Sequence, residues 1–352
     1  MIRDSCMWCV AGAESFRLRS RQIMPKKQYI NGKLKKIGFG GNLQNIEKSM
    51  RQIYIPDDGK ILVQTDQAGA EALIMGYDCE AGPYRQLFIH GVKPHVYVAI
   101  HLFPYVWQKK MKDVPGFDIQ EVIKTPIQAL KSIPYWRDLD SMIKDSDNWI
   151  HSERYYYFAK QTCHSANYDI QAQTFRMNVL EKSGGKISLP MDEATRFLLI
   201  YRSLFPEIPD RNRRVRLQAE RTKMLFNFFG EPYHISQYSP TESNFKEYYS
   251  WTPQSTVGEI TNRAYCMMQE YIESNRLDWD LLLNGHDSIV SQCPIPEAME
   301  CGKKQKEFIE QEFTSPVDGV VFRMKSETQA GLNWAPFKEK DNPTGLKELK
   351  FT

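Results

Sequence analysis

Two apolar runs that each lead to an aspartate constrain the fold of this chain more than any other feature. The run "GKILVQTD" (residues 59–66) has the length and β-branched content of a buried strand, and it ends at Asp66. The run "LLLNGHDSIVSQCP" (281–294) holds two apolar segments around an Asn-Gly pair, which is the pattern of a hairpin with Asp287 near its turn. The sequence therefore predicts a sheet assembled from both ends of the chain, in which the two aspartates can lie side by side.

The chain between these runs is mostly helical in its periodicity. Residues 93–216 carry apolar side chains at helical spacing, interrupted by prolines. Residues 222–236 are strand-rich, and residues 252–275 have the pattern of an amphipathic helix. These patterns predict a strand-rich core with a long helical excursion.

Composition excludes few classes of protein. The chain has 352 residues, of which 41% are hydrophobic and 25% charged, as in globular proteins with a buried core. The net charge of +3 gives no argument for nucleic-acid binding, but residues 17–36 carry eight Lys or Arg and no acid. Such a block is typical of phosphate binding, and equally of a solvated basic loop. Seven irregularly spaced cysteines and the lack of a long apolar run predict a cytoplasmic protein without a membrane span.

The two aspartates indicate a type of chemistry. Carboxylates held close together repel each other, and a divalent cation between them removes that repulsion. Carboxylate oxygens suit Mg²⁺, which usually binds one or two protein carboxylates and completes its shell with water and substrate phosphates. Two such ions can stabilise both the attacking and the leaving oxygen of a phosphoryl displacement. Asp66 and Asp287 are thus candidate metal ligands. The alternative is that they are two unrelated aspartates at loop ends, which is the commoner case for an arbitrary pair.

The stretch "KQTCHSANYD" (160–169) offers a candidate nucleotide-binding face. Lys160, His164 and Tyr168 are spaced i, i+4, i+8, so on a helix they would lie along one side. A nucleoside triphosphate lying there would present its phosphates, sugar and base in matching order. A mixed surface stripe without a ligand is the alternative.

Taken in chain order, these segments resemble the polymerase core of family A DNA polymerases, the group of bacterial polymerase I and the phage replicases. "GGNLQNIEKSMRQIYIPDDGKILVQTDQAGAEALI" (40–74) is similar to the start of that core, where Asn-Leu-Gln-Asn-Ile precedes the strand with the first catalytic aspartate. "NGHDSIV" (284–290) resembles the motif that carries the second. The resemblance runs in order from about residue 15 to 335. It implies an α+β fold: a right-hand polymerase palm, with an antiparallel sheet and helices, plus a mostly helical fingers subdomain.

The resemblance implies a role for each matched position. Asp66 and Asp287 would be catalytic and would hold two Mg²⁺ ions, for which Mn²⁺ can substitute, together with the backbone carbonyl of Gln67. Lys160 would act with them by neutralising the triphosphate, and Glu71 would exclude a 2′-hydroxyl. The positions expected to bind the dNTP are Glu71, His95, Lys160, His164 and Tyr168. The positions expected on the primer–template are Arg17, Asn42, Gln44, Asn45, Gln254 and His286.

The same resemblance implies a division of the chain. Residues 1–71 would form the N-terminal part of the palm, 72–235 the fingers and 236–352 the C-terminal part of the palm. The spacing between the triphosphate-contacting histidine and the fingers lysine exceeds that of the family, so an insertion at about 104–150 is expected. Family members carry a thumb, and often a 3′–5′ exonuclease, ahead of this core. We therefore expect these parts to be absent or to lie on a second polypeptide.

Three positions depart from the family pattern. Ser288 stands where a glutamate is usual, although single-subunit phage RNA polymerases carry the same His-Asp-Ser. Tyr156 stands where the fingers helix usually has an arginine, which weakens the expected γ-phosphate contact. Asp169 stands where a glycine is usual and would bring a negative charge near the incoming base.

The function predicted from the sequence is that of a DNA polymerase catalytic subunit, which adds dNTPs to a primer on a DNA template. If the gene belongs to a phage, the protein would work in the host cytoplasm. Two alternatives stay open. One is an RNA-synthesising relative, a primase or RNA polymerase, which the His-Asp-Ser motif favours. The other is a catalytically decayed subunit that binds primer–template, which the three departures favour.

Overall fold

The computed structural model describes side chains within residues 46–146 and 154–351. Ahead of them it describes the backbone of two antiparallel strand pairs, β1 (Met7–Cys9) with β2 (Arg19–Arg21) and β3 (Ile23–Ile30) with β4 (Lys33–Phe39). Four of the expected primer–template positions lie outside the described residues, namely Arg17, Asn42, Gln44 and Asn45.

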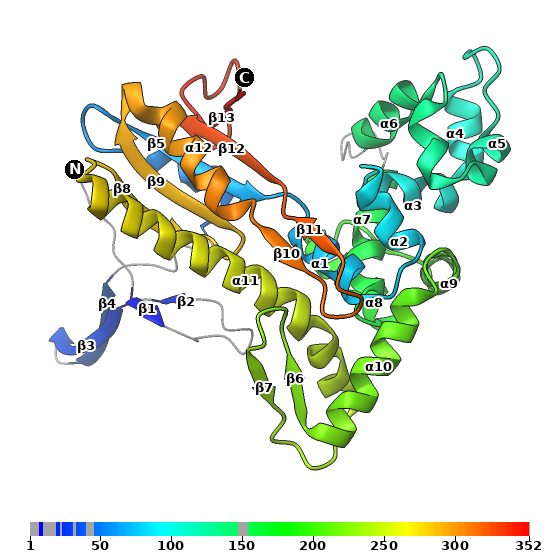
Figure 1. Ribbon diagram of the computed structural model, residues 1–352, viewed down its shortest axis with the longest axis horizontal. Helices are drawn as coiled ribbons and strands as arrows, with labels where there is room; N and C mark the ends of the chain where they lie inside the picture. Colours follow the sequence, from blue (N-terminus) through cyan, green and yellow to red (C-terminus); the bar gives the residue numbers. More distant parts are fainter. Residues whose placement is uncertain are drawn as a thin grey trace.

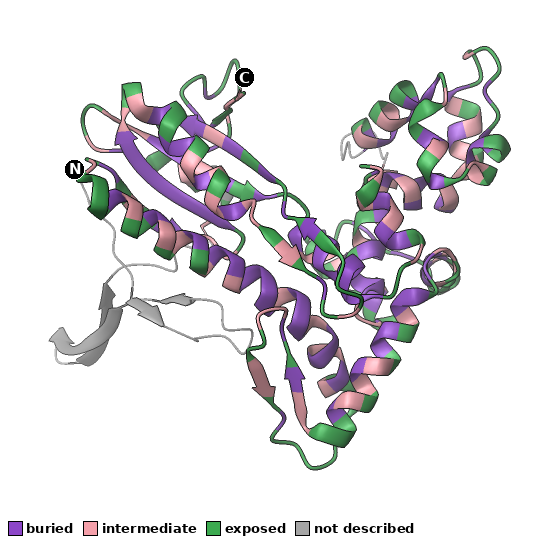
Figure 2. Ribbon diagram, viewed as in Figure 1, coloured by how far each residue is buried: buried purple, intermediate pink, exposed green. Residues whose placement is uncertain are grey.

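A five-stranded antiparallel sheet confirms that the two apolar runs pair with each other (Figure 1). Its order is β13-β12-β5-β9-β8, so β5 from the first run lies directly beside β9 from the second. The strands are β5 (Lys60–Gln67), β8 (Asp280–Asn284), β9 (Ser288–Pro294), β12 (Ser326–Gly331) and β13 (Lys347–Glu348). β9 is buried along nearly its whole length, as expected for a strand covered on both faces (Figure 2).

Successive residues of β5 face opposite sides of the sheet and belong to two different cores. Val63 packs in a cluster with Met268 and Cys301, from the two helices that run along one face of the sheet (Figure 1). These helices are α11 (Glu242–Asn275) and α12 (Ala298–Ile309). Leu62 packs on the other face in a cluster with Trp334, from the C-terminal segment. The sheet is therefore held from both sides.

Helix α11 begins ten residues before the predicted start at residue 252 and contains Pro253. Its first turn is stabilised by Asn244, whose side chain accepts the backbone N–H of Thr241 at 2.9 Å. A proline inside a helix leaves the carbonyl four residues earlier without its usual donor. Here that carbonyl, of Tyr249, accepts Nη1 of the buried Arg211 at 2.7 Å. This long-range contact explains why the helix continues through the proline.

The helical excursion is confirmed and forms a body of its own beside the sheet (Figure 1). Its helices are α1 (Ala70–Asp78), α2 (Pro83–Ile89), α3 (Pro94–Leu102), α4 (Pro104–Lys110), α5 (Ile119–Lys124), η3 (Ile127–Ser132), α6 (Trp136–Asp145), α7 (Tyr155–Ala166), α8 (Ala172–Lys182), α9 (Met191–Leu204) and α10 (Glu207–Thr222). Three of them begin with proline, which has a helical φ and needs no N–H partner there.

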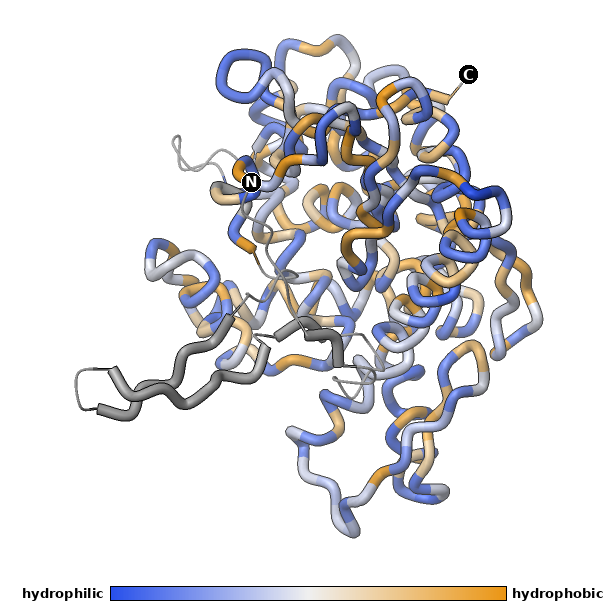
Figure 3. The backbone as a smooth tube through the Cα atoms, turned by 90° about the vertical axis from the view of Figure 1, so that its left-hand side faces the viewer, coloured by the Kyte–Doolittle hydropathy of each residue, from blue (hydrophilic) through white to orange (hydrophobic). Residues whose placement is uncertain are grey.

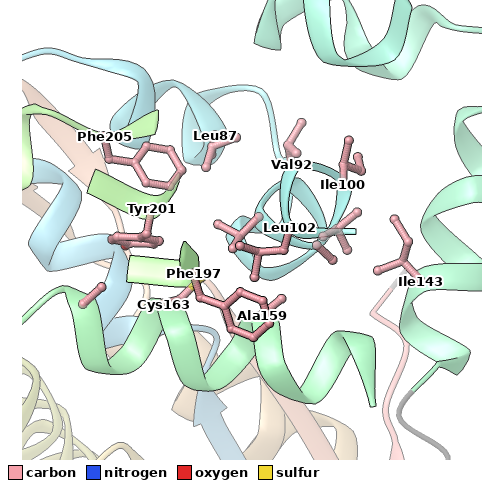
Figure 4. Close-up of a cluster of buried hydrophobic side chains, with 14 of the residues drawn as sticks. Leu87, Val92, Ile100, Leu102, Ile143, Ala159, Cys163, Phe197, Tyr201 and Phe205 are labelled. Atoms are coloured by element: carbon pink, nitrogen blue, oxygen red, sulfur yellow. The ribbon is translucent and has the colours of Figure 1, made fainter. Parts of the chain in front are cut away.

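One apolar cluster holds these helices together (Figure 4). Ile100 and Leu102 on α3 contribute to it with Ala159 on α7 and Phe197 on α9, all of them buried. α4, α5 and α6 lie within the range expected to be an insertion and project away from the sheet (Figure 1). Their apolar side chains continue the same cluster, so this segment shares its core with the rest of the helical body.

Two short hairpins complete the described part of the chain. β6 (Met224–Phe226) pairs with β7 (Pro232–His234), where a strand-rich segment was predicted, and β10 (Glu312–Thr314) pairs with β11 (Val321–Arg323). Hydrophilic and hydrophobic residues are interspersed along the described backbone, with no long uninterrupted apolar stretch (Figure 3). Among the described residues, no helix has the length and apolarity required to cross a membrane.

Candidate functional site

The end of the central sheet brings three acidic residues close together. Asp66 on β5 lies opposite Ser288 on β9 and opposite Glu327 on β12. Asp287 directly precedes Ser288, and its carbonyl accepts the backbone N–H of Gln67 at 2.8 Å. Asp66, Asp287 and Glu327 all retain exposed surface. Asp66 and Asp287 therefore lie at the same solvent-facing end of the sheet.

A three-residue loop between β8 and β9 presents Asp287. It replaces the two-residue Asn-Gly turn that the sequence suggested, because β8 continues to Asn284. A Cβ on Gly285 would lie 2.2 Å from Oγ of Ser288, so a larger residue there would displace the hydroxyl that hydrogen-bonds to Asp66. His286 has a left-handed backbone (φ 77°), and its carbonyl accepts the Thr261 hydroxyl at 2.8 Å. Thr261, on α11, thus fixes the loop.

The electrostatics of this sheet end favour a bound cation. Although Asp66 has exposed surface, partial burial and then the charges of Asp287 and Glu327 raise the pKa of its carboxyl to about 7. Hydrogen bonding from Ser288 and the charge of Arg51 act in the opposite direction. A divalent cation between the carboxylates would relieve the repulsion, and two carboxylates suit Mg²⁺ or Mn²⁺. The donor set therefore fits a divalent ion.

The remaining ligands of such an ion would not all be side chains. Within residues 46–146 and 154–351, no three His, Cys, Asp or Glu side chains are arranged to hold a metal ion together. The side chain of Gln67 is buried and its amide donates to the Thr261 hydroxyl on α11 at 2.7 Å, so the main-chain carbonyl is the expected ligand. Backbone oxygens, water or substrate phosphate would complete the shell.

A second cluster lies where α1 meets the end of α7. The Tyr168 hydroxyl donates to Oε2 of Glu71 at 3.0 Å. Burial, followed by the charge of Lys160, lowers the pKa of His164, while Glu71 opposes this shift. The prediction that Tyr168 lies on the same helix as Lys160 is wrong, because α7 ends at Ala166. Its N–H still donates to the Ser165 carbonyl at 3.2 Å, so the turn continues far enough to keep Tyr168 beside Glu71.

His95 on α3 faces the same side of α7. Its Nδ1 lies 3.5 Å from the Tyr156 hydroxyl, and its ring centroid lies 5.5 Å from that of His164. Burial, with the charges of His164 and Lys160, lowers the pKa of His95 to about 3. His95 is therefore uncharged at neutral pH. Its expected contact with a triphosphate would then be a hydrogen bond from the uncharged imidazole, which can still donate.

The structure explains the aspartate at position 169, which the sequence comparison of motifs left unexplained. Asp169 has a left-handed backbone (φ 52°), a conformation that glycine adopts easily and that aspartate tolerates better than most residues. Its Oδ1 accepts Nη2 of Arg202, on α9, at 2.9 Å. The negative charge is thus paired with an arginine.

Several residues at the site were not identified from the sequence. Thr261 joins β5 to the loop before β9, Glu327 adds a third acidic charge, and Arg51 lies 4.4 Å from the Trp334 ring centroid with its charge near Asp66. No local pattern marks them, because each depends on strand pairing or on contacts between distant segments. Gln254, which was identified, is half-buried on α11.

The fold and this sheet end together define an α+β architecture of antiparallel sheet and helices like that of a polymerase domain. No family profile matches the sequence, and no curated protein matches it. Among solved structures, the chain is similar to the POL domain of Pol1 from M. smegmatis, determined in complex with DNA primer-template and dNTP. The TM-score is 0.62 at 17% sequence identity, over 94% of this chain and 47% of that chain. This chain thus spans about half the length of that one, and the likeness concerns the fold.

Proposed function

We propose that this chain is the catalytic part of a template-directed DNA polymerase of the family A type, which transfers nucleotides from dNTPs to a primer 3′ end. The observation that carries the proposal is the pairing of β5 with β9, which brings Asp66 and Asp287 to one end of a sheet from distant parts of the chain. The likeness in fold to a polymerase domain supports it.

In this proposal Asp66 and Asp287 would hold two Mg²⁺ ions, together with the main-chain carbonyl of Gln67. When bound, such ions would stabilise the charge on the attacking 3′-hydroxyl and on the departing pyrophosphate. The 3′-oxygen forms a bond to the α-phosphorus, the bond from that phosphorus to the bridging oxygen breaks, and the hydroxyl proton is lost to solvent. Lys160, which is exposed on α7, would bind the triphosphate through its ammonium group. His95 would donate a hydrogen bond to the triphosphate from its uncharged imidazole.

Sugar and base selection would belong to the second cluster. Glu71 would lie under the sugar and leave no room for a 2′-hydroxyl, with Tyr168 holding its carboxylate in place. His164 would lie between the sugar and the triphosphate. Gln254 and His286, on either side of the primer end, would contact the primer–template.

The experiment that tests this function is extension of a labelled primer–template by the purified chain, with Mg²⁺ or Mn²⁺ and with dNTPs or rNTPs. We expect extension with dNTPs and its loss in Asp66→Asn and Asp287→Asn, while the DNA affinity is unchanged. Asp113→Asn is the matched control, because it removes an exposed carboxylate in the helical body. Turnover by either site variant would contradict the two-metal assignment.

The same assay separates the alternatives. A preference for rNTPs would indicate an RNA-synthesising relative, which the His-Asp-Ser sequence around Asp287 favours. Binding of primer–template without extension under any metal and nucleotide would indicate a subunit that has lost catalysis. Extension that begins only when a second polypeptide is added would indicate that a thumb lies on another chain.

A further inference from the structure

The hydrogen bond between Glu71 and Tyr168 joins two separate elements. Glu71 lies in the first turn of α1, and Tyr168 lies just beyond the end of α7. A hydrogen bond of 3.0 Å between their side chains requires both backbones to be held in a fixed relation. Two adjacent residues of α10 can fix the position of α1 relative to the end of α7, because one contacts α1 and the other contacts the end of α7.

The first of these residues is Arg211, whose side chain is fully enclosed. Its Nε and Nη2 donate to Oδ2 of Asp78 at 2.7 and 2.5 Å. Asp78 is the last residue of α1 and lies two helical turns from Glu71 on the same side of that helix. Arg214 adds a bond of 3.0 Å to the other oxygen of Asp78. The position of α1 along its axis is therefore set by a buried ion pair with α10.

The second residue is Asn212, which is buried beside Arg211. Its Nδ2 donates to the backbone carbonyl of Asn167 at 3.1 Å, one residue before Tyr168. The side chain of Asn167 is fixed as well: it accepts the Tyr201 hydroxyl at 2.5 Å and donates to the Tyr84 hydroxyl at 3.1 Å. The end of α7 is thus anchored to α10 through buried amides.

The two anchors are joined to each other. Nη1 of Arg211 donates to Oδ1 of Asn212 at 3.0 Å and to the Tyr249 carbonyl at 2.7 Å, the carbonyl left without a helical donor by Pro253. All these groups are buried, where an unmade hydrogen bond is costly. The network therefore favours a single arrangement of α1, α7, α10 and α11.

We propose that Arg211 and Asn212 are positioning residues that set the geometry of the Glu71–Tyr168 pair and thereby the discrimination between deoxyribonucleotides and ribonucleotides. This inference rests on the proposed function, in which Glu71 excludes the 2′-hydroxyl. Neither residue touches the nucleotide. Both act through the elements that carry Glu71 and Tyr168.

The variant that tests the inference is Asn212→Asp. It keeps the size of the side chain and an oxygen for Arg211, but it replaces the donor to the Asn167 carbonyl with an acceptor that repels it. We expect the ratio of kcat/KM for dNTP to that for rNTP to fall by about three- to tenfold, the effect of one buried hydrogen bond. A loss that affects both sugars equally would mean that Asn212 only supports the fold, and would overturn the inference.

Two further variants make the result specific. Asn227→Asp is the matched control, because Asn227 is buried, accepts the backbone N–H groups of Phe229 and Glu231 with its Oδ1, and has no partner for its Nδ2 within residues 46–146 and 154–351. We expect its discrimination ratio to equal that of the wild type. In a Glu71→Gln background, Asn212→Asp should change the ratio less than it does alone, because both act on one gate. Full additivity would contradict the inference.

The failure of the inference is distinguishable from failure of the proposed function. A wild-type chain that extends primers while Asn212→Asp discriminates normally overturns only the inference. A wild-type chain that binds primer–template but extends it under no metal and nucleotide overturns the proposed function. The anchoring is then measured by amide hydrogen exchange of residues 163–170, which should exchange about threefold or more faster in Asn212→Asp. Unchanged exchange in that segment would overturn the anchoring as well.

Discussion

The Tyr168 hydroxyl donates a hydrogen bond of 3.0 Å to Oε2 of Glu71, across 97 positions of sequence. If this pair selects the sugar, removal of Glu71 matters more than removal of the hydroxyl that steadies it. We expect Glu71→Ala to raise ribonucleotide incorporation by about tenfold or more, and Tyr168→Phe to raise it by only about two- to fivefold. Single-nucleotide kcat/KM values for dNTP and rNTP measure both effects.

The tyrosine variant needs a control for general effects of the substitution. Tyr238→Phe supplies it, since the Tyr238 side chain is 93% exposed and lies outside both clusters. A dNTP/rNTP ratio that stays at the wild-type value in Glu71→Ala would remove Glu71 as the gate.

The raised pKa of Asp66 predicts a metal-dependent change of stability with pH. A carboxyl that titrates at about 7 when folded, and at its ordinary value of 3.8 when unfolded, binds its proton more tightly in the folded state. Its contribution to folding is fully present below about pH 4 and is lost as the pH rises through 7. Without metal, we expect the wild type to lose more stability between pH 5 and 8 than Asp66→Asn. Mg²⁺ should restore stability at pH 8 in the wild type only.

Urea denaturation at pH 5 and pH 8, with EDTA or with Mg²⁺, measures this difference. Comparison with Asp66→Asn is needed because other groups titrate in the same range. The buried His95, with its pKa lowered to about 3, has the opposite dependence and gains stability as the pH rises from 3 to 6.5. Equal pH dependence in the wild type and Asp66→Asn would contradict the repulsion between the aspartates.

The central strands were predictable because their signal is local. The alternation and the turn residues of 281–294 indicate a hairpin, and β5 was predicted to within one residue at each end. The proximity of Asp66 and Asp287 followed from one assumption, that the apolar runs 59–66 and 281–294 pair as strands of one sheet. The expected domain boundaries, cytoplasmic location and second polypeptide remain predictions.

The features that sequence reasoning missed depend on contacts between distant segments. Helix α11 passes through Pro253 because a buried arginine from α10 takes the freed Tyr249 carbonyl, and nothing near Pro253 encodes that arginine. The uncharged state of His95 arises from burial between α3 and α7. Tyr168 was predicted to lie on the helix, but α7 ends at Ala166 and the backbone turns left-handed at Asp169.

The serine after the second aspartate has a predictable effect on the first. Ser288 is buried, and its hydrogen bond lowers the pKa of Asp66. Ser288→Ala should therefore raise that pKa further and move the acidic limb of the pH–activity profile toward higher pH. We expect activity above pH 8 to fall by only about two- to fivefold, because both aspartates remain. Ser291→Ala, three residues further along β9, where the hydroxyl accepts a hydrogen bond from Gln305 instead, should leave the limb in place. A collapse of activity at every pH would mean that the serine itself is catalytic.

The left-handed residue at the end of α7 gives the last prediction. Asp169→Gly relieves the backbone at φ 52°, which is worth about 1 kcal/mol, and removes a half-exposed ion pair with Arg202 worth about 0–1 kcal/mol. The two effects oppose each other, so the free energy of unfolding should change by less than about 1 kcal/mol. Asp169→Val loses the ion pair and places a β-branched residue in a conformation that such residues avoid, so it should be less stable than the glycine variant by about 1–2 kcal/mol. Urea denaturation of the two variants measures the difference. Equal stability of the two variants would mean that the left-handed backbone does not explain the aspartate at this position.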